Sequence, residues 1–180
     1  MIYIPTGSEL LNPNKILEKL DLRAGMTVTD LGCGTSGHFV FPSAKIVGEN
    51  GKVYAVDILK SALSSIDSKA KMQNFDNIES VWSDIEVFGG AKIKEESCDA
   101  VYLINVHPKP TMIKEALRIL KKGGKLLLVD WKASATDNLG PATADRVSRE
   151  EAKKRAGEFR LTLEEEFDAG KYHWALIYKK

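Results

Sequence analysis

Short apolar runs alternate with stretches of helical periodicity along most of the chain. The runs are rich in Val, Ile, Leu and Tyr and are mostly apolar on both faces, which is typical of parallel strands covered on both sides. They predict strands at residues 26–31, 53–57, 78–82, 99–105 and 125–131. Helical periodicity predicts helices at residues 14–20, 38–47, 60–72 and 111–120. This alternation with short links indicates right-handed crossovers and a doubly wound α/β fold.

Local start and stop signals refine the later part of the pattern. Lysines and glycines at residues 121–124 predict the end of the preceding helix, with glycine in a left-handed cap. Ser148 and Glu151 predict a capping box that opens a short helix, which Gly157 ends. Residues 159–167 and 172–178 predict two strands joined by a tight turn. Five alternating units therefore end in an antiparallel hairpin.

Composition limits the classes of function. A length of 180 residues favours one domain, residues 1–180, and 26 basic against 25 acidic residues offer no footprint for nucleic acid and no membrane anchor. Cys33 and Cys98 form no CxxC pair, and His38 does not complete a zinc set, so no metal is expected. With no signal peptide or membrane-spanning run in view, a reduced, cytoplasmic chain is the simplest interpretation.

A glycine-rich loop follows the first predicted strand. Gly32, Gly34 and Gly37 fit GxGxxG between a strand and a helix, where the backbone must turn sharply and approach a ligand closely. Asp57 ends the second strand, where a carboxylate accepts both hydrogen bonds of a ribose diol. Asp30 would repel a pyrophosphate and attract an ammonium or sulfonium group. The set favours a cationic nucleoside, with turn-capping roles for the two aspartates as the alternative.

The run DLGCGTSG at residues 30–37 resembles motif I of class I S-adenosylmethionine-dependent methyltransferases. Residues 16–25 resemble the helix and turn before that motif, and residues 120–130 are similar to the Gly-Gly segment that leads into the family's fifth strand. The nearest subgroup is the small, stand-alone type 11 domain. The resemblance implies a Rossmann-like seven-stranded sheet that ends in an antiparallel hairpin, and S-adenosyl-L-methionine as the cofactor.

Site residues follow from the same resemblance. Asp84 lies in the segment that contacts adenine and would accept a hydrogen bond from its exocyclic amine. The residues implied in cofactor binding are Asp30, Gly32, Cys33, Gly34, Gly37, Asp57, Ile58, Asp84, Ile85 and Asn105. Two departures stand out. Lys122 replaces the proline that is usual before the two glycines, and the run Asn105-Val106-His107-Pro108 lacks the Asn-Pro-Pro-Tyr sequence of enzymes that methylate amide or exocyclic nitrogens.

His107 is the candidate general base. It follows the fourth strand, at the sheet edge where open α/β folds bind ligands, and a neutral imidazole there could accept a proton from a hydroxyl or thiol. The alternative is a loop histidine that fixes its neighbours. Many such transfers need no base, because the cofactor supplies an activated methyl group and the protein supplies orientation.

Five further side chains have simpler expected roles. His38 is expected to be exposed at a helix start, and His173 to pack or hydrogen-bond locally in the last strand. Cys33 could be activated by a helix N-terminus, although a small loop residue is the simpler interpretation. Trp82 and Trp131 end strands, where core packing is favoured over stacking on a ligand.

The leading hypothesis is a methyltransferase that acts on a small-molecule acceptor. The alternatives are a non-catalytic cofactor-binding partner subunit and a nicotinamide-dependent oxidoreductase, which would need a larger second region. An arsenic acceptor would require several thiols that converge on one point, and two cysteines so far apart in the sequence do not favour such a site. Acceptor specificity is expected in residues 1–13, 107–110 and 132–147, and the sequence predicts no oligomeric state.

Overall fold

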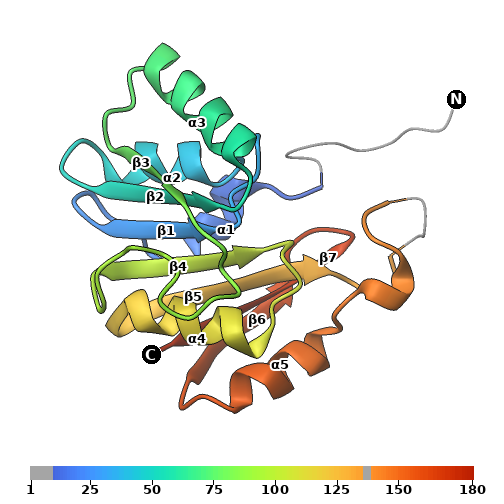
Figure 1. Ribbon diagram of the computed structural model, residues 1–180. Helices are drawn as coiled ribbons and strands as arrows, with labels where there is room; N and C mark the ends of the chain where they lie inside the picture. Colours follow the sequence, from blue (N-terminus) through green and yellow to red (C-terminus); the bar gives the residue numbers. More distant parts are fainter. Residues whose placement is uncertain (1–9, 136–138) are drawn as a thin grey trace, which may run out of the picture.

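A seven-stranded sheet organises the chain (Figure 1). The computed structural model describes residues 10–135 and 139–180. The strand order is β3-β2-β1-β4-β5-β7-β6, in which β1 to β5 are parallel and β7 runs antiparallel to both neighbours. The strands are β1 (Thr27–Leu31), β2 (Lys52–Asp57), β3 (Ile78–Trp82), β4 (Cys98–Ile104), β5 (Leu120–Trp131), β6 (Thr162–Asp168) and β7 (His173–Lys179). This Rossmann-like order and the terminal hairpin confirm the predicted fold.

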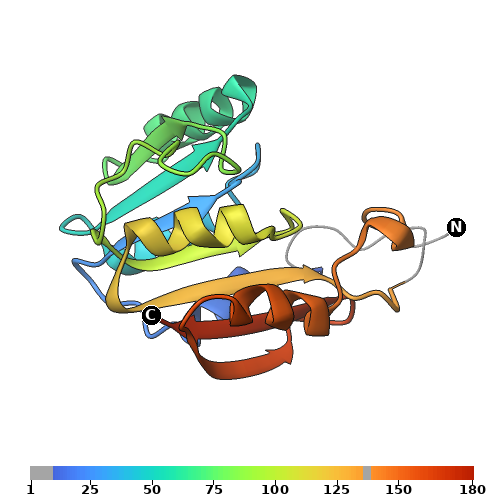
Figure 2. The ribbon, with the colours of Figure 1, turned by 60° about the horizontal axis from the view of Figure 1, so that its bottom comes forward.

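Helices cover both faces of the sheet (Figure 2). One apolar cluster joins a sheet face to α1, α2 and α3, and a second joins the other face to α4 and α5. Because both faces are covered, the central strands carry apolar side chains in both directions, as their sequences predict. The helices are α1 (Pro13–Glu18), α2 (Val40–Val47), α3 (Lys60–Met72), α4 (Pro110–Ile119) and α5 (Arg149–Gly157), with a short 3₁₀ helix, η2 (Thr143–Asp145).

The topology gathers the ligand-side loops at one edge. β1 lies between β2 and β4. The chain adds β2 and β3 on one side of β1 and then crosses over to add β4 and β5 on the other side, so the strand order reverses at β1. Loops that follow the carboxyl ends of these strands form a crevice at such a switch point. The loop after β1 contains the glycines, Asp57 is the last residue of β2, and the loops after β3 and β4 carry Asp84 and His107.

Residues 121–124 do not cap a helix, contrary to the sequence-based expectation. α4 ends at Ile119, and Leu120 is already extended as the first residue of β5. Gly123 has the positive φ of 78° expected of a left-handed glycine, but its N–H donates to the Lys180 carbonyl within the sheet. The register between β4 and β5 shifts here, so the glycines form an irregularity in a strand rather than a helix terminus.

Ser148 starts α5 as predicted, since its hydroxyl accepts a hydrogen bond from the Glu151 N–H at 3.1 Å.

Trp131 packs in the core with 8% exposure, as expected. Trp82 does not, because 60% of it is exposed. The reason is its position at the end of β3, an edge strand that has a neighbour on one side only.

Candidate functional site

The glycine loop turns tightly at the end of β1. Both Gly32 and Cys33 donate their N–H groups to the Val56 carbonyl, at 2.8 and 3.0 Å. Gly32 has φ of 86°, and a Cβ at this position would lie 2.4 Å from Cγ1 of Val106. Glycine is therefore required twice here, by the backbone conformation and by the close approach of the loop after β4.

Asp57 ties the glycine loop to β2. Its Oδ2 accepts the N–H of Gly34 and its Oδ1 accepts the N–H of Leu59, both at 2.9 Å. Gly34 has φ of 63°, and a Cβ at this position would meet no atom within 4 Å. The Asp57 carboxylate, 8% exposed, is thus oriented by two backbone amides beside an open stretch of loop.

A cavity of about 260 Å³ lies on one side of the loop. Its lining includes Asp30, Cys33, His38, Ile104 and Asn105. Asp30 is 3% exposed, and burial, reinforced by the nearby negative charge of Asp57, raises its pKa to about 7. A cavity with an acidic side chain of this kind favours a cationic ligand, because the cation would offset the cost of the buried charge.

A second cavity of about 370 Å³ lies on the other side. It is lined by Gly32, Asp57, Ile58, Ser83, Asp84, Ile85, Glu86, Val106 and Met112. Gly32 belongs to both linings, so the two cavities adjoin at the glycine loop. Asp84 is exposed, and its Oδ1 accepts the Glu86 N–H at 2.9 Å in a tight turn. An elongated ligand that crosses Gly32 would have acidic groups on both sides.

All the residues implied in cofactor binding except Gly37 line one of these two cavities. Gly37 has a packing role instead, since a Cβ there would lie 2.6 Å from both Ile66 and Phe41 side-chain atoms. His107 lines neither cavity, although its neighbours Asn105 and Val106 do. Its role as a base stays a prediction.

Asp130 holds the loop that contains His107, a role that sequence reasoning missed. Its Oδ2 accepts the His107 N–H at 2.9 Å and its Oδ1 accepts the Trp131 N–H at 2.7 Å. Both Asn105 and His107 have φ of 55°, an uncommon conformation for side chains other than glycine. The strain is held where β4 ends beside the cavities. An acidic residue one position before the end of a buried strand was the signal available in the sequence.

The remaining candidates differ in outcome. His38 is half-buried rather than exposed, and its Nε2 lies 2.8 Å from the Leu11 carbonyl. Burial raises the pKa of the Cys33 thiol, so this cysteine is not activated. His173 packs as expected, with its ring 4.2 Å from that of Trp131, and burial lowers its pKa to about 4.

The expected specificity segments are only partly visible. Residues 1–9 and 136–138 lie outside the described residues, so the expectations for 1–13 and 132–147 are tested there in part only. Within the visible part of 132–147, Arg146 donates to the carbonyls of Pro141, Ala135 and Leu139. Across residues 10–135 and 139–180, no helix is both long and apolar enough to span a bilayer, and no cluster of His, Cys, Asp and Glu could hold a metal.

Comparison with known proteins supplies a family. The methyltransferase-domain family matches residues 22–175. The chain is 30% identical to the ubiquinone/menaquinone biosynthesis C-methyltransferase of Escherichia coli O1:K1, over 67% of this chain and 49% of that enzyme. It is 35% identical to human arsenite methyltransferase, over 57% of this chain and 30% of that enzyme. The chain thus spans about half or less of these curated relatives.

Solved structures share the whole fold. A SAM-dependent methyltransferase from Aquifex aeolicus superposes with a TM-score of 0.86 at 25% identity, covering 97% of this chain and 93% of that one. Geranyl diphosphate C-methyltransferase from Streptomyces coelicolor, in complex with S-adenosyl-L-homocysteine, superposes with a TM-score of 0.74 at 13% identity. The match covers 93% of this chain and 78% of that one. The second likeness concerns the fold alone.

Proposed function

The chain belongs to the methyltransferase-domain family, whose methyl donor is S-adenosyl-L-methionine, and on that premise we propose that it methylates a small organic acceptor. The observation that carries the proposal is the arrangement at Gly32. Two cavities adjoin there, with Asp30 in one and Asp57 and Asp84 in the other. This arrangement suits a cation joined to a nucleoside better than it suits a dinucleotide, because a pyrophosphate would face carboxylates on both sides.

The lining residues fit this donor. Asp30 supplies negative charge in a cavity that offers it little solvent, which favours the ammonium or sulfonium end of the molecule. Open space over Gly34 leaves room for a ligand to approach the backbone. Each Asp57 oxygen accepts a single amide hydrogen bond and keeps acceptor capacity for a ribose hydroxyl. The Oδ2 atom of Asp84 would accept a hydrogen bond from the exocyclic amine of adenine.

The donor brings an activated methyl group, so the protein's contribution is orientation and the exclusion of water. Asn105 and Val106 line the cavities from the loop after β4, which Asp130 fixes. His107, in the same loop, is our candidate to accept a proton from a hydroxyl or thiol acceptor. With a carbon, nitrogen or thiolate acceptor that is already nucleophilic, no base is needed.

An organic acceptor is favoured over arsenic. Arsenic is a soft centre that calls for several converging thiolates. The chain has two cysteines, of which Cys33 follows β1 at the cavity edge. Cys98 is the first residue of β4, which places it at the opposite end of the sheet. Similarity to an arsenite methyltransferase therefore does not carry that acceptor to this chain.

The proposal is tested by transfer of a labelled methyl group from the donor to a panel of phenols, thiols, amines and quinol-like carbon acids. We expect label in at least one organic product, and far less of it at the same donor concentration when Asp57→Ala replaces the parent protein. Label with arsenite alone would refute the organic class. No transfer to any acceptor, despite tight binding of S-adenosylhomocysteine, would favour the partner-subunit alternative.

A further inference from the structure

A buried ion pair on α4 contacts the loop between β3 and β4. Glu115 and Arg118 lie three residues apart, and their closest oxygen–nitrogen distance is 2.7 Å. The Glu115 side chain is fully buried and that of Arg118 is 10% exposed. Neither takes part in the proposed chemistry. A buried ion pair is costly to desolvate, so its presence is weak evidence for stabilisation, and its role is better judged from the groups that it contacts.

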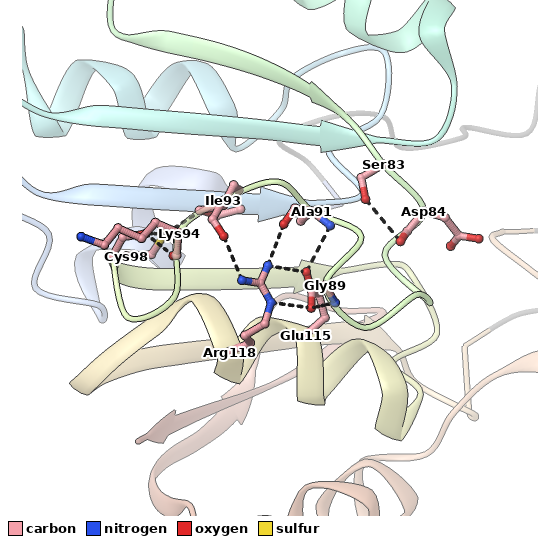
Figure 3. Close-up of polar contacts among 11 residues, drawn as sticks. Ser83, Asp84, Gly89, Ala91, Ile93, Lys94, Cys98, Glu115 and Arg118 are labelled. Carbon is pink, nitrogen blue, oxygen red and sulfur yellow. Dashed lines mark hydrogen bonds and ion pairs between the residues drawn. The ribbon is translucent and has the colours of Figure 1, made fainter.

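The pair uses its remaining hydrogen-bonding capacity on the loop, residues 83–97 (Figure 3). The Glu115 carboxylate accepts the Gly89 N–H at 2.7 Å and the Ala91 N–H at 3.1 Å. The Arg118 guanidinium donates to the carbonyls of Ala91 at 2.6 Å and Ile93 at 2.9 Å. Four backbone groups of a segment without helix or strand are thereby satisfied by two side chains of α4.

Gly90 transmits this anchoring to the start of the loop. A Cβ at Gly90 would lie 2.8 Å from the Asp84 carbonyl oxygen and 3.1 Å from Ser83 Oγ. Its N–H donates to the Val87 carbonyl, and the Val87 N–H donates to that of Asp84. The anchored stretch at Gly89–Ala91 thus packs directly against Asp84, the proposed adenine contact.

α4 serves the cavity through one face. Met112 lines the cavity beside Asp57 and Asp84, and Glu115 lies one turn further along the same face. Burial alone would raise the pKa of Glu115, but hydrogen bonds from Arg118 and the loop amides outweigh it and hold this pKa below its usual value. The Glu115 carboxylate therefore stays charged while it accepts the hydrogen bonds of the loop amides.

We propose that Glu115, held by Arg118, is a positioning residue for the cofactor: it fixes the β3–β4 loop so that Asp84 meets the adenine. The inference rests on the proposed cofactor site. It deepens that site by assigning cofactor affinity, rather than the transfer step, to a pair that does not touch the ligand. Changes to the pair should raise the dissociation constant for adenosyl ligands and the KM for the donor, with kcat at saturation largely retained.

Two substitutions with matched controls test it. Glu115→Gln keeps the size of the side chain and removes its charge, while Gly90→Ala displaces the loop without leaving a buried charge unpaired. Glu150→Gln on α5 is the control for the first, since Glu150 also pairs with a basic residue three positions along its own helix, Lys153. Gly157→Ala is the control for the second, because a Cβ there meets no atom within 4 Å.

The measurement is calorimetric titration with S-adenosylhomocysteine and with adenosine. We expect Glu115→Gln and Gly90→Ala to weaken both ligands by a similar factor, about tenfold, with stoichiometry near one and with both controls unchanged. A purely structural role would instead lower the stoichiometry and leave the dissociation constant as it was. If Glu115→Gln does not melt cooperatively and is therefore not folded, the affinity of Gly90→Ala decides whether the position of the loop controls cofactor binding.

A double-mutant cycle with Asp84→Asn locates the effect. We expect Asp84→Asn to cost clearly less affinity when Gly90→Ala is already present, because the loop no longer presents Asp84 correctly. Equal costs in both backgrounds, or wild-type affinity in both variants, would overturn the inference while leaving the proposed function intact. Failure of the parent protein to bind S-adenosylhomocysteine would remove the proposed function itself, a result distinct from either.

Discussion

The Asp130 carboxylate accepts the backbone N–H of His107 at 2.9 Å, so the end of β5 fixes the loop after β4. Asp130 is 3% exposed, and burial raises its pKa, while the hydrogen bonds from Trp131 and His107 oppose that shift. The contact holds His107 in a left-handed conformation beside the cavity wall. It makes the position of a candidate base depend on a neighbouring strand.

His107→Ala should therefore separate chemistry from binding. If the imidazole accepts the acceptor's proton, kcat falls about 100-fold while affinity for S-adenosylhomocysteine is unchanged. Asp130→Asn should give a smaller loss of kcat in the same direction, because it acts only through the backbone. Steady-state rates and calorimetry on the two variants check this. Rates for His107→Ala equal to the parent's would leave His107 a structural residue of the loop.

Asp57→Ala should remove most cofactor affinity. Two charge-assisted hydrogen bonds to the ribose are lost, and we expect about 100-fold weaker binding of S-adenosylhomocysteine. Because Asp57 also holds Gly34, the ribose contribution is isolated by comparing adenosine with 2′-deoxyadenosine. The parent protein should prefer adenosine, whereas the variant should not discriminate. A variant that keeps the parent's preference would refute the ribose assignment.

Asp30→Asn should stabilise the unliganded protein and weaken donor binding. The pKa of Asp30 is about 7 in the folded protein, above its ordinary value of 3.8. The folded state thus binds the proton more tightly, so this residue's contribution to stability is present at low pH and is lost as pH rises through about 7. We expect the variant to melt roughly 3 °C above the parent at pH 8, and not at pH 4.

The binding side of the same prediction has its own readout. A carboxylate at position 30 should favour S-adenosylmethionine, which is a sulfonium, over neutral-sulfur S-adenosylhomocysteine as pH increases from 6 to 8. Asp30→Asn should abolish that pH-dependent preference. If the asparagine variant binds both ligands as the parent does at every pH, Asp30 faces the backbone rather than the ligand's charge.

Gly32→Ala should be far more damaging than Gly34→Ala. Both glycines have positive φ, but only at Gly32 would the added methyl collide, 2.4 Å from Val106. We expect a loss of about 3 kcal/mol in unfolding free energy for Gly32→Ala and about 1 kcal/mol for Gly34→Ala. Denaturant melts check the order, and Val106→Ala combined with Gly32→Ala should recover part of the larger loss. Equal losses at the two positions would contradict the described packing.

The sequence carried enough information to predict the sheet and the terminal hairpin, because both depend on local periodicity. It also indicated the glycine loop and Asp57, since loops at the carboxyl ends of adjacent parallel strands must meet. The end of α4 was mispredicted for a non-local reason. Gly123 has the conformation expected of a helix cap, but its partner is Lys180 at the far end of the chain.

Side chains whose partners are distant in the sequence were also missed. Glu115 lies next to the apolar stripe of α4, where a charged residue is normally solvated, and only the packed loop shows that it is buried. A Glu–Arg pair three residues apart beside that stripe was the available signal. Asp130 and Val106 likewise gain their roles from loops that follow other strands.

The central claim is that this chain binds an adenosyl cofactor across Gly32. Calorimetric titration of the unmodified protein with S-adenosylhomocysteine, with reduced nicotinamide dinucleotide as the control ligand, tests it most directly. We expect saturable binding of S-adenosylhomocysteine, one molecule per chain, and no binding of the dinucleotide. Binding of the dinucleotide alone, or of neither ligand, would contradict this claim.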